Sequence, residues 1–390
     1  MNPERFIKPE VRGIEISGIR KMANLVAKYP DALSLTIGQP DFPTPAHIVE
    51  AGKRALDEGR TGYTANPGMP ELRQAAAAFV ADKYGLFYRW QDEVIVTVGA
   101  SEALDMTLRA IVCAGDEVIL PGPIYPGYEP LVRMAGGVPV TVDTRADGFR
   151  MTAEALEAAI TPRTKAVLLC SPANPTGRSQ DRASLEKIAA VLRGRDLVVI
   201  SDEIYSELLF DGEHVSIASL PDMRERTVVI NGLSKSHSMT GWRIGFAFAP
   251  AWLAEHLVKV HQYNVTCATS VSQCAAIAAL TAGRDDALPM REAYRRRRDY
   301  VCDRLVAMGM EIHRPEGAFY VFPSIARFGL SSQEFAHRLL ERERVAVVPG
   351  DAFGPLGEGY IRLSYAYSEE TLREGLDRLE KFLRSLDGGA

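Results

Sequence analysis

Residues 231–245 read Asn-Gly-Leu-Ser-Lys-Ser-His-Ser-Met-Thr-Gly-Trp-Arg-Ile-Gly. They follow a β-branched run at residues 227–230 and lead into a second apolar run at residues 244–249. Two short apolar runs predict buried strands, and the small and polar residues between them predict a turn. The turn places Lys235 at the end of a buried strand, with Arg243 further along the same segment.

A lysine at such a strand end suits covalent chemistry with a carbonyl group. Burial disfavours the charged ammonium, so the amine tends to become neutral and nucleophilic. Neutral lysine amines form Schiff bases with carbonyls, including the aldehyde of pyridoxal 5′-phosphate (PLP). An arginine offers paired N–H donors to a phosphate group. Lys235 is therefore the candidate catalytic residue and Arg243 a candidate phosphate ligand; a surface loop with two ordinary basic residues is the alternative.

The run Gly-Leu-Ser-Lys-x-x-Ser-Met-x-Gly-x-Arg-Ile-Gly resembles the PLP attachment signature of class I aminotransferases. Residues 15–20, 34–42, 121–130 and 231–245 carry a narrower resemblance to bacterial N-acetyl-L,L-diaminopimelate aminotransferases of lysine biosynthesis. The resemblance implies PLP as cofactor and exchange of an amino group between an L-amino acid and a 2-oxo acid. It also implies an obligate homodimer with shared active sites.

Composition excludes several classes of protein. The chain has 390 residues and a net charge of −5, which predict two or three domains and disfavour nucleic acid as a partner. Residues 295–298 form a basic run, but they lie in a helical pattern that predicts a solvated helix face. No signal core is present and no apolar run approaches the ~20 residues that span a bilayer.

The five cysteines are widely spaced and odd in number. They form no metal-ligand pair and no plausible disulfide framework. A reducing cytosol is expected, and with it a cytoplasmic protein that uses no metal. The residues concerned are Cys113, Cys170, Cys267, Cys274 and Cys302.

From residue 94 the chain alternates short apolar runs with helical patterns. Such alternation predicts an α/β fold, with a mostly parallel seven-stranded sheet covered by helices on both faces. The expected strands are residues 94–98, 117–120, 138–142, 166–170, 197–200, 227–230 and 244–249. Expected helices include residues 70–84, 101–112, 153–160 and 182–192.

After about residue 280 the composition shifts towards long charged helices. Helices are expected at residues 291–308, 332–343 and 369–386, with strands at 345–348 and 360–364. This pattern predicts a smaller α+β domain. We divide the chain into an N-terminal arm, a large PLP-binding domain and a small C-terminal domain. Their ranges are 1–35, 36–280 and 281–390, and the arm is expected to pack on the small domain or on a partner subunit.

Ligands bind beyond the carboxyl ends of parallel strands. For each part of PLP that needs a protein contact, a candidate residue follows such a strand end. Residues 98–102 turn from a strand into a helix, whose N-terminus offers free N–H groups and partial positive charge to a phosphate. Ala100 and Ser101 are the expected donors, with Arg243 as the counter-charge. Many relatives carry a phosphate-binding serine where this chain has Gly232, and Ser234 is the candidate to replace it.

The cofactor ring needs a carboxylate beside its nitrogen, which raises the basicity of that nitrogen. Asp202 directly follows an expected strand, and Glu203 is its rival. The run Asp-Glu-Ile-Tyr matches the Asp-x-x-Tyr spacing of the resembled family. On that match, Asp202 serves the nitrogen and Tyr205 donates a hydrogen bond to the phenolic oxygen of the ring.

Two further strand ends supply contacts to the ring. Asn174 lies in Ser-Pro-Ala-Asn-Pro-Thr-Gly after the strand at 166–170, and its amide can donate to the phenolic oxygen. Either X-Pro bond of that segment can be cis. Tyr125, in the segment Pro-Gly-Pro-Ile-Tyr-Pro, is expected to stack on the ring, with Tyr128 as the alternative.

The remaining site residues come from the resemblance. It implies that Gly38 presents its backbone N–H to the substrate carboxylate, together with Asn174. Arg362, inside an otherwise apolar strand, would clamp the α-carboxylate with two parallel hydrogen bonds. Tyr63 would reach the cofactor phosphate of a partner subunit. Some aspartate-specific relatives carry a lysine where this chain has Ser101. Its absence argues against a dedicated aspartate enzyme and is compatible with a substrate that has a longer, acylated side chain.

Four other functions are alternatives to an N-acetyl-L,L-diaminopimelate aminotransferase. An aspartate, aromatic or broad-specificity aminotransferase is the nearest alternative. A carbon–sulfur β-lyase would keep the fold and change the reaction, which fold alone does not exclude. A PLP-binding transcriptional regulator would carry a DNA-binding helix-turn-helix, and none precedes residue 36. A nicotinamide oxidoreductase is disfavoured because no strand is followed by Gly-x-Gly-x-x-Gly.

Overall fold

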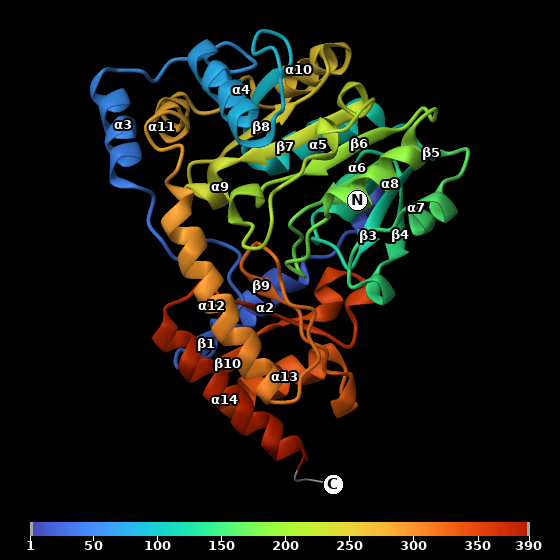
Figure 1. The fold of residues 1–390 in the computed structure, drawn as a ribbon, viewed down its shortest axis with the longest axis vertical. Helices are drawn as coiled ribbons and strands as arrows, with labels where there is room; N and C mark the ends of the chain where they lie inside the picture. Colours follow the sequence, from blue (N-terminus) through green and yellow to red (C-terminus); the bar gives the residue numbers. More distant parts are fainter. Residues whose placement is uncertain (1–2, 388–390) are drawn as a thin grey trace.

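The computed structural model describes residues 3–387, which form two parts along the long axis (Figure 1). A seven-stranded sheet lies in the upper part, in the order β2-β8-β7-β6-β5-β3-β4. Only β8 runs antiparallel to its neighbours. The predicted mostly parallel sheet is therefore confirmed. The strands are β2 (Val94–Val98), β3 (Glu117–Gly122), β4 (Val138–Asp143), β5 (Thr164–Cys170), β6 (Val198–Asp202), β7 (Thr227–Gly232) and β8 (Ile244–Phe248).

Helices cover both faces of this sheet. The central strands β6 and β7 are buried along their whole length, as expected of Val- and Ile-rich strands in a parallel sheet. One face packs against α5 (Gly99–Ile111), α6 (Tyr128–Met134) and α10 (Ala251–Val265). The other packs against α4 (Pro70–Tyr84), α7 (Ala153–Ala159), α8 (Arg182–Leu192) and α11 (Ser270–Leu280). Helix α3 (Ala46–Asp57) lies outside α11.

The lower part combines helices with two small sheets. Its helices are α12 (Ala287–Ala307), α13 (Ser332–Glu343) and α14 (Glu369–Asp387). Strands β9 (Tyr320–Val321), β11 (Val348–Pro349) and β12 (Ile361–Ser364) form an antiparallel sheet in the order β11-β12-β9. The predicted smaller α+β unit is confirmed as a fold.

The predicted single strand at residues 345–348 is wrong. The chain forms β10 (Val345–Ala346) beside β1 (Leu33–Ser34), and then changes sheets at Val347 to form β11. A run of four apolar residues carries no signal for such a change of partner, because every residue in it is buried on either sheet.

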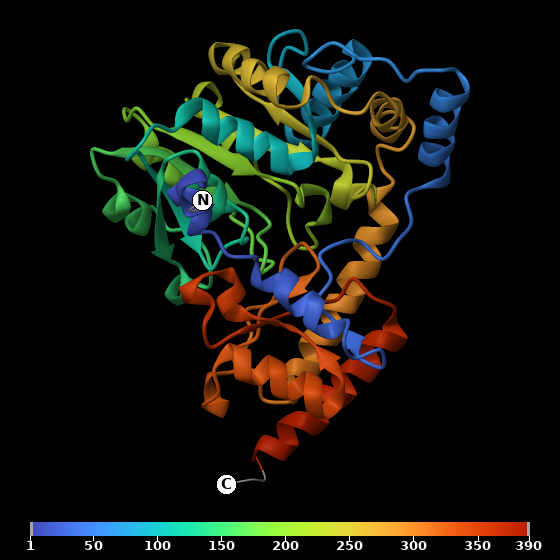
Figure 2. The ribbon, with the colours of Figure 1, turned by 180° about the vertical axis from the view of Figure 1, so that it is seen from behind.

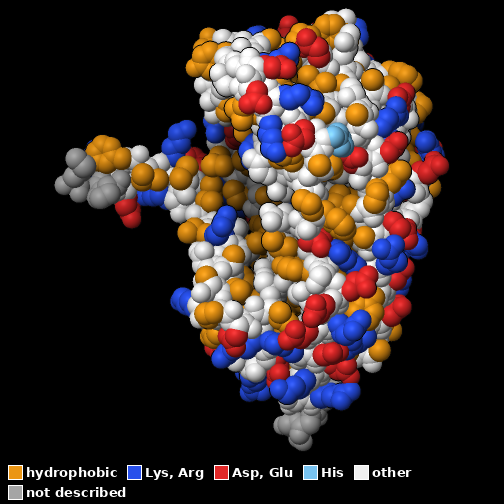
Figure 3. All heavy atoms as spheres, turned by 90° about the vertical axis from the view of Figure 1, so that its left-hand side faces the viewer, with side chains coloured by type: hydrophobic (Ala, Val, Ile, Leu, Met, Phe, Trp, Pro, Cys, Tyr) orange, Lys and Arg blue, Asp and Glu red, His pale blue; other side chains and the backbone are white. Residues whose placement is uncertain are grey.

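The N-terminal segment lies against both parts, since α1 (Pro9–Arg12) contacts α6 of the upper part and α2 (Gly18–Val26) crosses the lower part (Figure 2). There α2 contacts β11. In the side view the first described residues stand away from the body of the molecule (Figure 3). Apolar side chains are exposed on this segment: Phe6 is 72% exposed and Ile16 65%.

The prediction that residues 295–298 form a solvated helix face is only partly right. Helix α12 begins at Ala287 rather than at residue 291, and only part of residues 295–298 faces solvent. Arg298 is 3% exposed. No helix within residues 3–387 is both long enough and apolar enough to cross a membrane.

Candidate active site

The segment after β7 forms one turn of helix, α9 (Leu233–Ser236), rather than a loop. Lys235 lies on this turn, and its Nζ donates to the Gly38 carbonyl oxygen at 2.6 Å. The rings of Tyr205 and Phe319 each lie 5.9 Å from Nζ. Burial lowers the pKa of the Lys235 amine to about 8, helped by the positive charges of Arg362 and Arg243. A substantial fraction of this amine is thus neutral near physiological pH.

Asp202 ends β6 and is 5% exposed. Its carboxylate accepts hydrogen bonds from the Tyr128 hydroxyl at 2.7 Å and from the Ile204 backbone N–H at 3.2 Å. Burial raises the pKa of Asp202 to about 6 in spite of these donors. No basic side chain among the described residues forms an ion pair with it.

Glu203 is engaged elsewhere. Its carboxylate accepts from the Ser201 and Ser216 hydroxyls at 2.8 and 2.6 Å and contacts His214 Nε2 at 2.8 Å. Successive side chains near a strand end point to opposite faces, so Asp202 and Glu203 enter different surroundings. Asp202, unlike Glu203, has no basic side chain within ion-pair distance among the described residues.

Arg362 lies on β12 and is 1% exposed. Its Nη1 donates to Asn174 Oδ1 at 3.0 Å and its Nη2 to the Thr36 carbonyl at 2.6 Å, while Nε has no partner. The guanidinium carbon lies 4.3 Å from the ring centre of Tyr320 and 5.0 Å from that of Phe353. No carboxylate among residues 3–387 pairs with it, and burial lowers its pKa. A buried guanidinium without an acid suits an anionic ligand.

A second positively charged site lies where β2 leads into α5. Arg243 precedes β8, and since β8 runs antiparallel, its first residue lies beside the last residue of β2. The guanidinium packs so closely on Gly99 that an ideal Cβ there would lie 2.3 Å from Nη2. Gly99 also has φ +73°, a conformation that favours glycine. Ala100 and Ser101 follow in the first turn of α5, where backbone N–H groups lack helical partners.

The position before α9 explains one departure from the resembled motif. An ideal Cβ on Gly232 would lie 2.9 Å from the Ile244 carbonyl oxygen and 3.1 Å from the Gly245 Cα. A serine would crowd the backbone of β8 at that point. Ser234 is buried, and its hydroxyl forms no hydrogen bond with the described residues.

The other predicted residues divide into two groups. Tyr205 is buried and its hydroxyl lies 3.0 Å from that of Tyr320. Tyr125 is partly buried, with its ring 5.4 Å from the ring of Tyr128 in an edge-to-face arrangement. Tyr63, in contrast, is 89% exposed in the loop before α4. The structure thus brings most predicted residues to one edge of the sheet and leaves Tyr63 on the surface.

Comparisons with known proteins give the family. A profile described as "Aminotransferase class I and II" matches residues 30–379. The chain belongs to the class I and II aminotransferases. These enzymes use PLP, so this chain is a PLP-dependent aminotransferase.

Individual relatives of this aminotransferase cover nearly its whole length. It is 57% identical to a "Probable N-acetyl-LL-diaminopimelate aminotransferase" of Bacillus subtilis, over 97% of this chain and 96% of that protein. An aspartate aminotransferase of Pyrococcus abyssi is 46% identical over 94% and 96%. The solved aspartate aminotransferase of Thermus thermophilus with maleate has a TM-score of 0.92 at 40% identity, covering 96% of this chain and 99% of that chain.

The residues of the aminotransferase site fit PLP. Asp202 offers a buried carboxylate that lacks a cation, which matches the protonated nitrogen of the ring. The close approach of Arg243 to Gly99 forms a cationic corner at a helix N-terminus, which matches the phosphate. Lys235 offers an amine with a lowered pKa, which matches the aldehyde.

Sequence reasoning missed several contacts of this site. Tyr128 was considered only as a stacking ring, yet its hydroxyl holds Asp202. Tyr320 and Phe353 enclose Arg362, and Thr36 accepts from it. No sequence signal indicates Thr36 or Tyr320, because they come from segments far from Arg362 along the chain. Phe353 is nearer in sequence, but its contact depends on the fold of the segment between it and Arg362.

Proposed function

We propose that this aminotransferase exchanges an amino group between N-acetyl-L,L-diaminopimelate and 2-oxoglutarate, a reaction of lysine biosynthesis. The observation that carries an amino-acid and 2-oxo-acid reaction is Arg362, buried without an acid at the same edge as Lys235. The choice of the acetylated substrate is supported by the relative at 57% identity and by Ser101, where some aspartate-specific relatives have a lysine.

In this proposal Arg362 binds the α-carboxylate of either substrate through its Nε and Nη groups. The Gly38 N–H and the Asn174 amide complete that pocket. Both residues already lie beside the residues of this site: the Gly38 carbonyl oxygen accepts from Lys235 Nζ, and Asn174 Oδ1 accepts from Arg362. A carboxylate would supply the negative charge that the guanidinium lacks. The substrate is thus held by its carboxylate with its amino-bearing carbon towards Lys235.

Bound PLP supplies an aldehyde for the amine and a ring that accepts electrons from the substrate. Asp202 holds a proton at the ring nitrogen, and Tyr128 keeps its carboxylate oriented. Asn174 and Tyr205 serve the phenolic oxygen, and Tyr125 covers the ring. Lys235 Nζ would take the proton from the substrate carbon as a general base and deliver it to the cofactor carbon as a general acid.

The phosphate is assigned to Ala100, Ser101, Ser234 and Arg243. Tyr63 of the partner subunit would complete this group, so the proposal includes a homodimer with shared sites. Exposed apolar side chains support it, because exposed apolar patches commonly mark interfaces. Tyr63 is 89% exposed and Tyr263 88%, in addition to the residues of the N-terminal segment. The division into an arm, a large domain and a small domain at residues 35 and 280 belongs to the same proposal.

A mixing experiment tests the shared site. Subunits carrying Lys235→Ala and subunits carrying Tyr63→Phe are each expected to be poor catalysts. A mixed dimer contains one site with Lys235 of one subunit and Tyr63 of the other, so mixing after mild dissociation should restore activity. Activity that never exceeds the sum of the two variants would contradict the shared site.

A substrate screen tests the reaction. Each amino donor is mixed in single turnover with the PLP form, and the loss of the visible absorbance is followed. N-acetyl-L,L-diaminopimelate and glutamate should react at least ten times faster than aspartate, phenylalanine or tyrosine. Faster reaction with aspartate or the aromatic acids would support the alternative aminotransferases. Release of pyruvate, ammonia and homocysteine from cystathionine would support the β-lyase.

A further inference from the structure

Tyr320 lies between the two halves of the proposed site. Strand β9 pairs antiparallel with β12, with Tyr320 opposite Ser364 and Val321 opposite Leu363. Since side chains alternate along a strand, Tyr320 and Arg362 point to the same face. Tyr320 is buried, and its ring centre lies 4.3 Å from the Arg362 guanidinium. The face of this tyrosine therefore supports the arginine proposed to bind substrate.

The hydroxyl end of Tyr320 reaches the cofactor side. Its Oη lies 3.0 Å from Tyr205 Oη, and an ideal Cβ on Gly38 would lie 3.2 Å from it. Tyr205 in turn borders Lys235, whose Nζ is 5.9 Å from its ring centre. One side chain thus contacts both the carboxylate-binding arginine and the tyrosine assigned to the phenolic oxygen.

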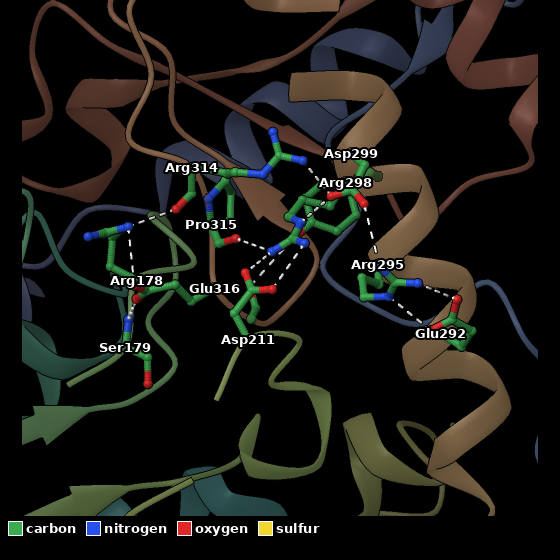
Figure 4. Close-up of polar contacts among 12 residues, drawn as sticks. Arg178, Ser179, Asp211, Glu292, Arg295, Arg298, Asp299, Arg314, Pro315 and Glu316 are labelled. Atoms are coloured by element: carbon green, nitrogen blue, oxygen red, sulfur yellow. Dashed lines mark hydrogen bonds and ion pairs between the residues drawn. The ribbon is translucent and has the colours of Figure 1, made fainter. Parts of the chain in front are cut away.

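The backbone before Tyr320 is held by two loops of the upper part. The N–H groups of Glu316 and Gly317 donate to the Gly177 carbonyl at 2.8 and 3.0 Å, and Ala318 N–H donates to Leu208 at 3.0 Å. The Glu316 carboxylate accepts from the Ser179 N–H at 2.8 Å and pairs with Arg178 at 3.4 Å (Figure 4). The position of Tyr320 is thereby fixed relative to the loop of Asn174 and the turn of Tyr205.

Counting protons gives the direction of the Tyr205–Tyr320 hydrogen bond. Each phenol has a single O–H donor. If Tyr205 donates to the cofactor, its proton is not available to Tyr320. Tyr320 must then donate to Tyr205, which is the hydrogen-bond partner of its hydroxyl among the described residues.

We propose that Tyr320 is a positioning residue for the transamination reaction. Its hydroxyl donates to Tyr205 and directs the Tyr205 proton to the phenolic oxygen of the cofactor, while its ring supports Arg362. The inference rests on the function proposed above. A hydroxyl that accepts a hydrogen bond becomes a stronger donor, so Tyr320 strengthens the bond from Tyr205 to the cofactor.

The consequence is measurable without turnover. A stronger donor favours the deprotonated form at the phenolic oxygen and lowers the pH at which the bound cofactor titrates in its visible absorbance. Tyr320→Phe keeps the ring and removes the hydroxyl. It should raise the titration midpoint by about 0.1–0.3 unit, because the bond from Tyr205 remains and only its strengthening by Tyr320 is lost. The KM of each substrate should change less than about threefold.

Four further variants sharpen the test. Tyr205→Phe should raise the midpoint by more than Tyr320→Phe, and the double variant should match Tyr205→Phe alone, because the effect of Tyr320 passes through Tyr205. Tyr320→Leu also removes the ring from Arg362, and should raise the KM of both substrates about tenfold. Tyr365→Phe is the matched control, since Tyr365 is fully buried beside the same sheet and its hydroxyl donates to the Gly317 carbonyl instead of to Tyr205.

The outcomes distinguish a failure of the role proposed for Tyr320 from a failure of the assignment of Tyr205. A midpoint unchanged by Tyr320→Phe but raised by Tyr205→Phe overturns the role of Tyr320. A midpoint unchanged by both overturns the assignment of Tyr205 in the proposed function. Equal shifts in Tyr320→Phe and Tyr365→Phe would also overturn the role, because they would show a general effect of losing a buried hydroxyl.

Discussion

Two arginines of the lower part are buried to nearly the same degree but have different partners. Arg298 on α12 is 3% exposed, and it pairs with Asp211 and with Asp299 at 2.9 Å and donates to the Pro315 carbonyl at 2.9 Å (Figure 4). Arg362 on β12 is 1% exposed and has an amide oxygen, a backbone carbonyl and two aromatic rings around it. Arg298 thus has two acids and Arg362 has none.

The electrostatic consequences are opposite. Burial by itself lowers the pKa of Arg298, but its two carboxylates outweigh burial and the net shift is upward. Burial lowers the pKa of Arg362 with no carboxylate to oppose it. A buried charge without a counter-charge is costly for the fold, so its retention points to a ligand that brings the counter-charge. Arg298 belongs to the scaffold, whereas we assign Arg362 to the substrate.

The largest predicted effect is on stability at Arg298. Arg298→Ala removes the hydrogen bonds of a buried guanidinium to the Pro315 carbonyl and to Asp211, while Asp299 keeps Arg314. It should lower the free energy of unfolding by about 2–3 kcal/mol. Denaturant unfolding of the PLP form measures it. Arg296→Ala, on the exposed side of the same helix, is the matched control and should change stability by less than about 0.5 kcal/mol. Similar losses in both variants would remove the distinction between a scaffold arginine and a surface one.

The next effect is on substrate binding at Arg362. Arg362→Gln should raise the KM of the amino donor and of the 2-oxo acid about a hundredfold, since it removes the charged half of a buried pair. PLP should remain bound, and the free energy of unfolding should stay unchanged or rise, because an uncompensated charge is removed. Steady-state kinetics with both substrates and cofactor titration measure these effects. Loss of PLP, or a stability loss as large as that of Arg298→Ala, would place Arg362 in the scaffold.

The smallest effect is a change in the titration of Lys235. In the cofactor-free protein, labelling of this amine by a small acylating reagent should increase with pH and level off above a midpoint near pH 8, since the pKa is lowered to about 8. Arg362→Gln should move the midpoint upward, because the positive charge of Arg362 lowers that pKa. Arg296→Ala should leave it in place. Peptide mapping of the label across pH gives the midpoint, and an unmoved midpoint in Arg362→Gln would contradict the coupling.

The same lowered pKa has a consequence for stability, with a defined sign. The ordinary lysine pKa of 10.5 applies to the unfolded chain, which therefore holds a proton that the folded protein has released between about pH 8 and 10.5. Where the unfolded state binds more protons, stability rises with pH. The contribution of Lys235 to stability should therefore increase across that window.

Several features of this aminotransferase follow from its sequence alone. Alternating apolar runs and helical patterns determine the parallel sheet, because each strand between two helical layers must be apolar on both faces. The positions of Lys235, Asp202 and Asn174 after three of those strands place them at one edge, since parallel strands end on the same side. The Asn231–Gly245 segment, with its lysine and arginine, was sufficient to indicate the family.

Other features depended on contacts between distant segments. The different surroundings of Asp202 and Glu203 depend on the contact of the first with Tyr128 and of the second with His214. The burial of Arg298 in a run that reads as a solvated face follows from Asp211, far away in the chain. A local pattern specifies which side of an element is apolar, but the partner of a polar side chain is set by the packing of remote elements. For that reason only the tertiary structure distinguished the arginine with two acids from the arginine with none.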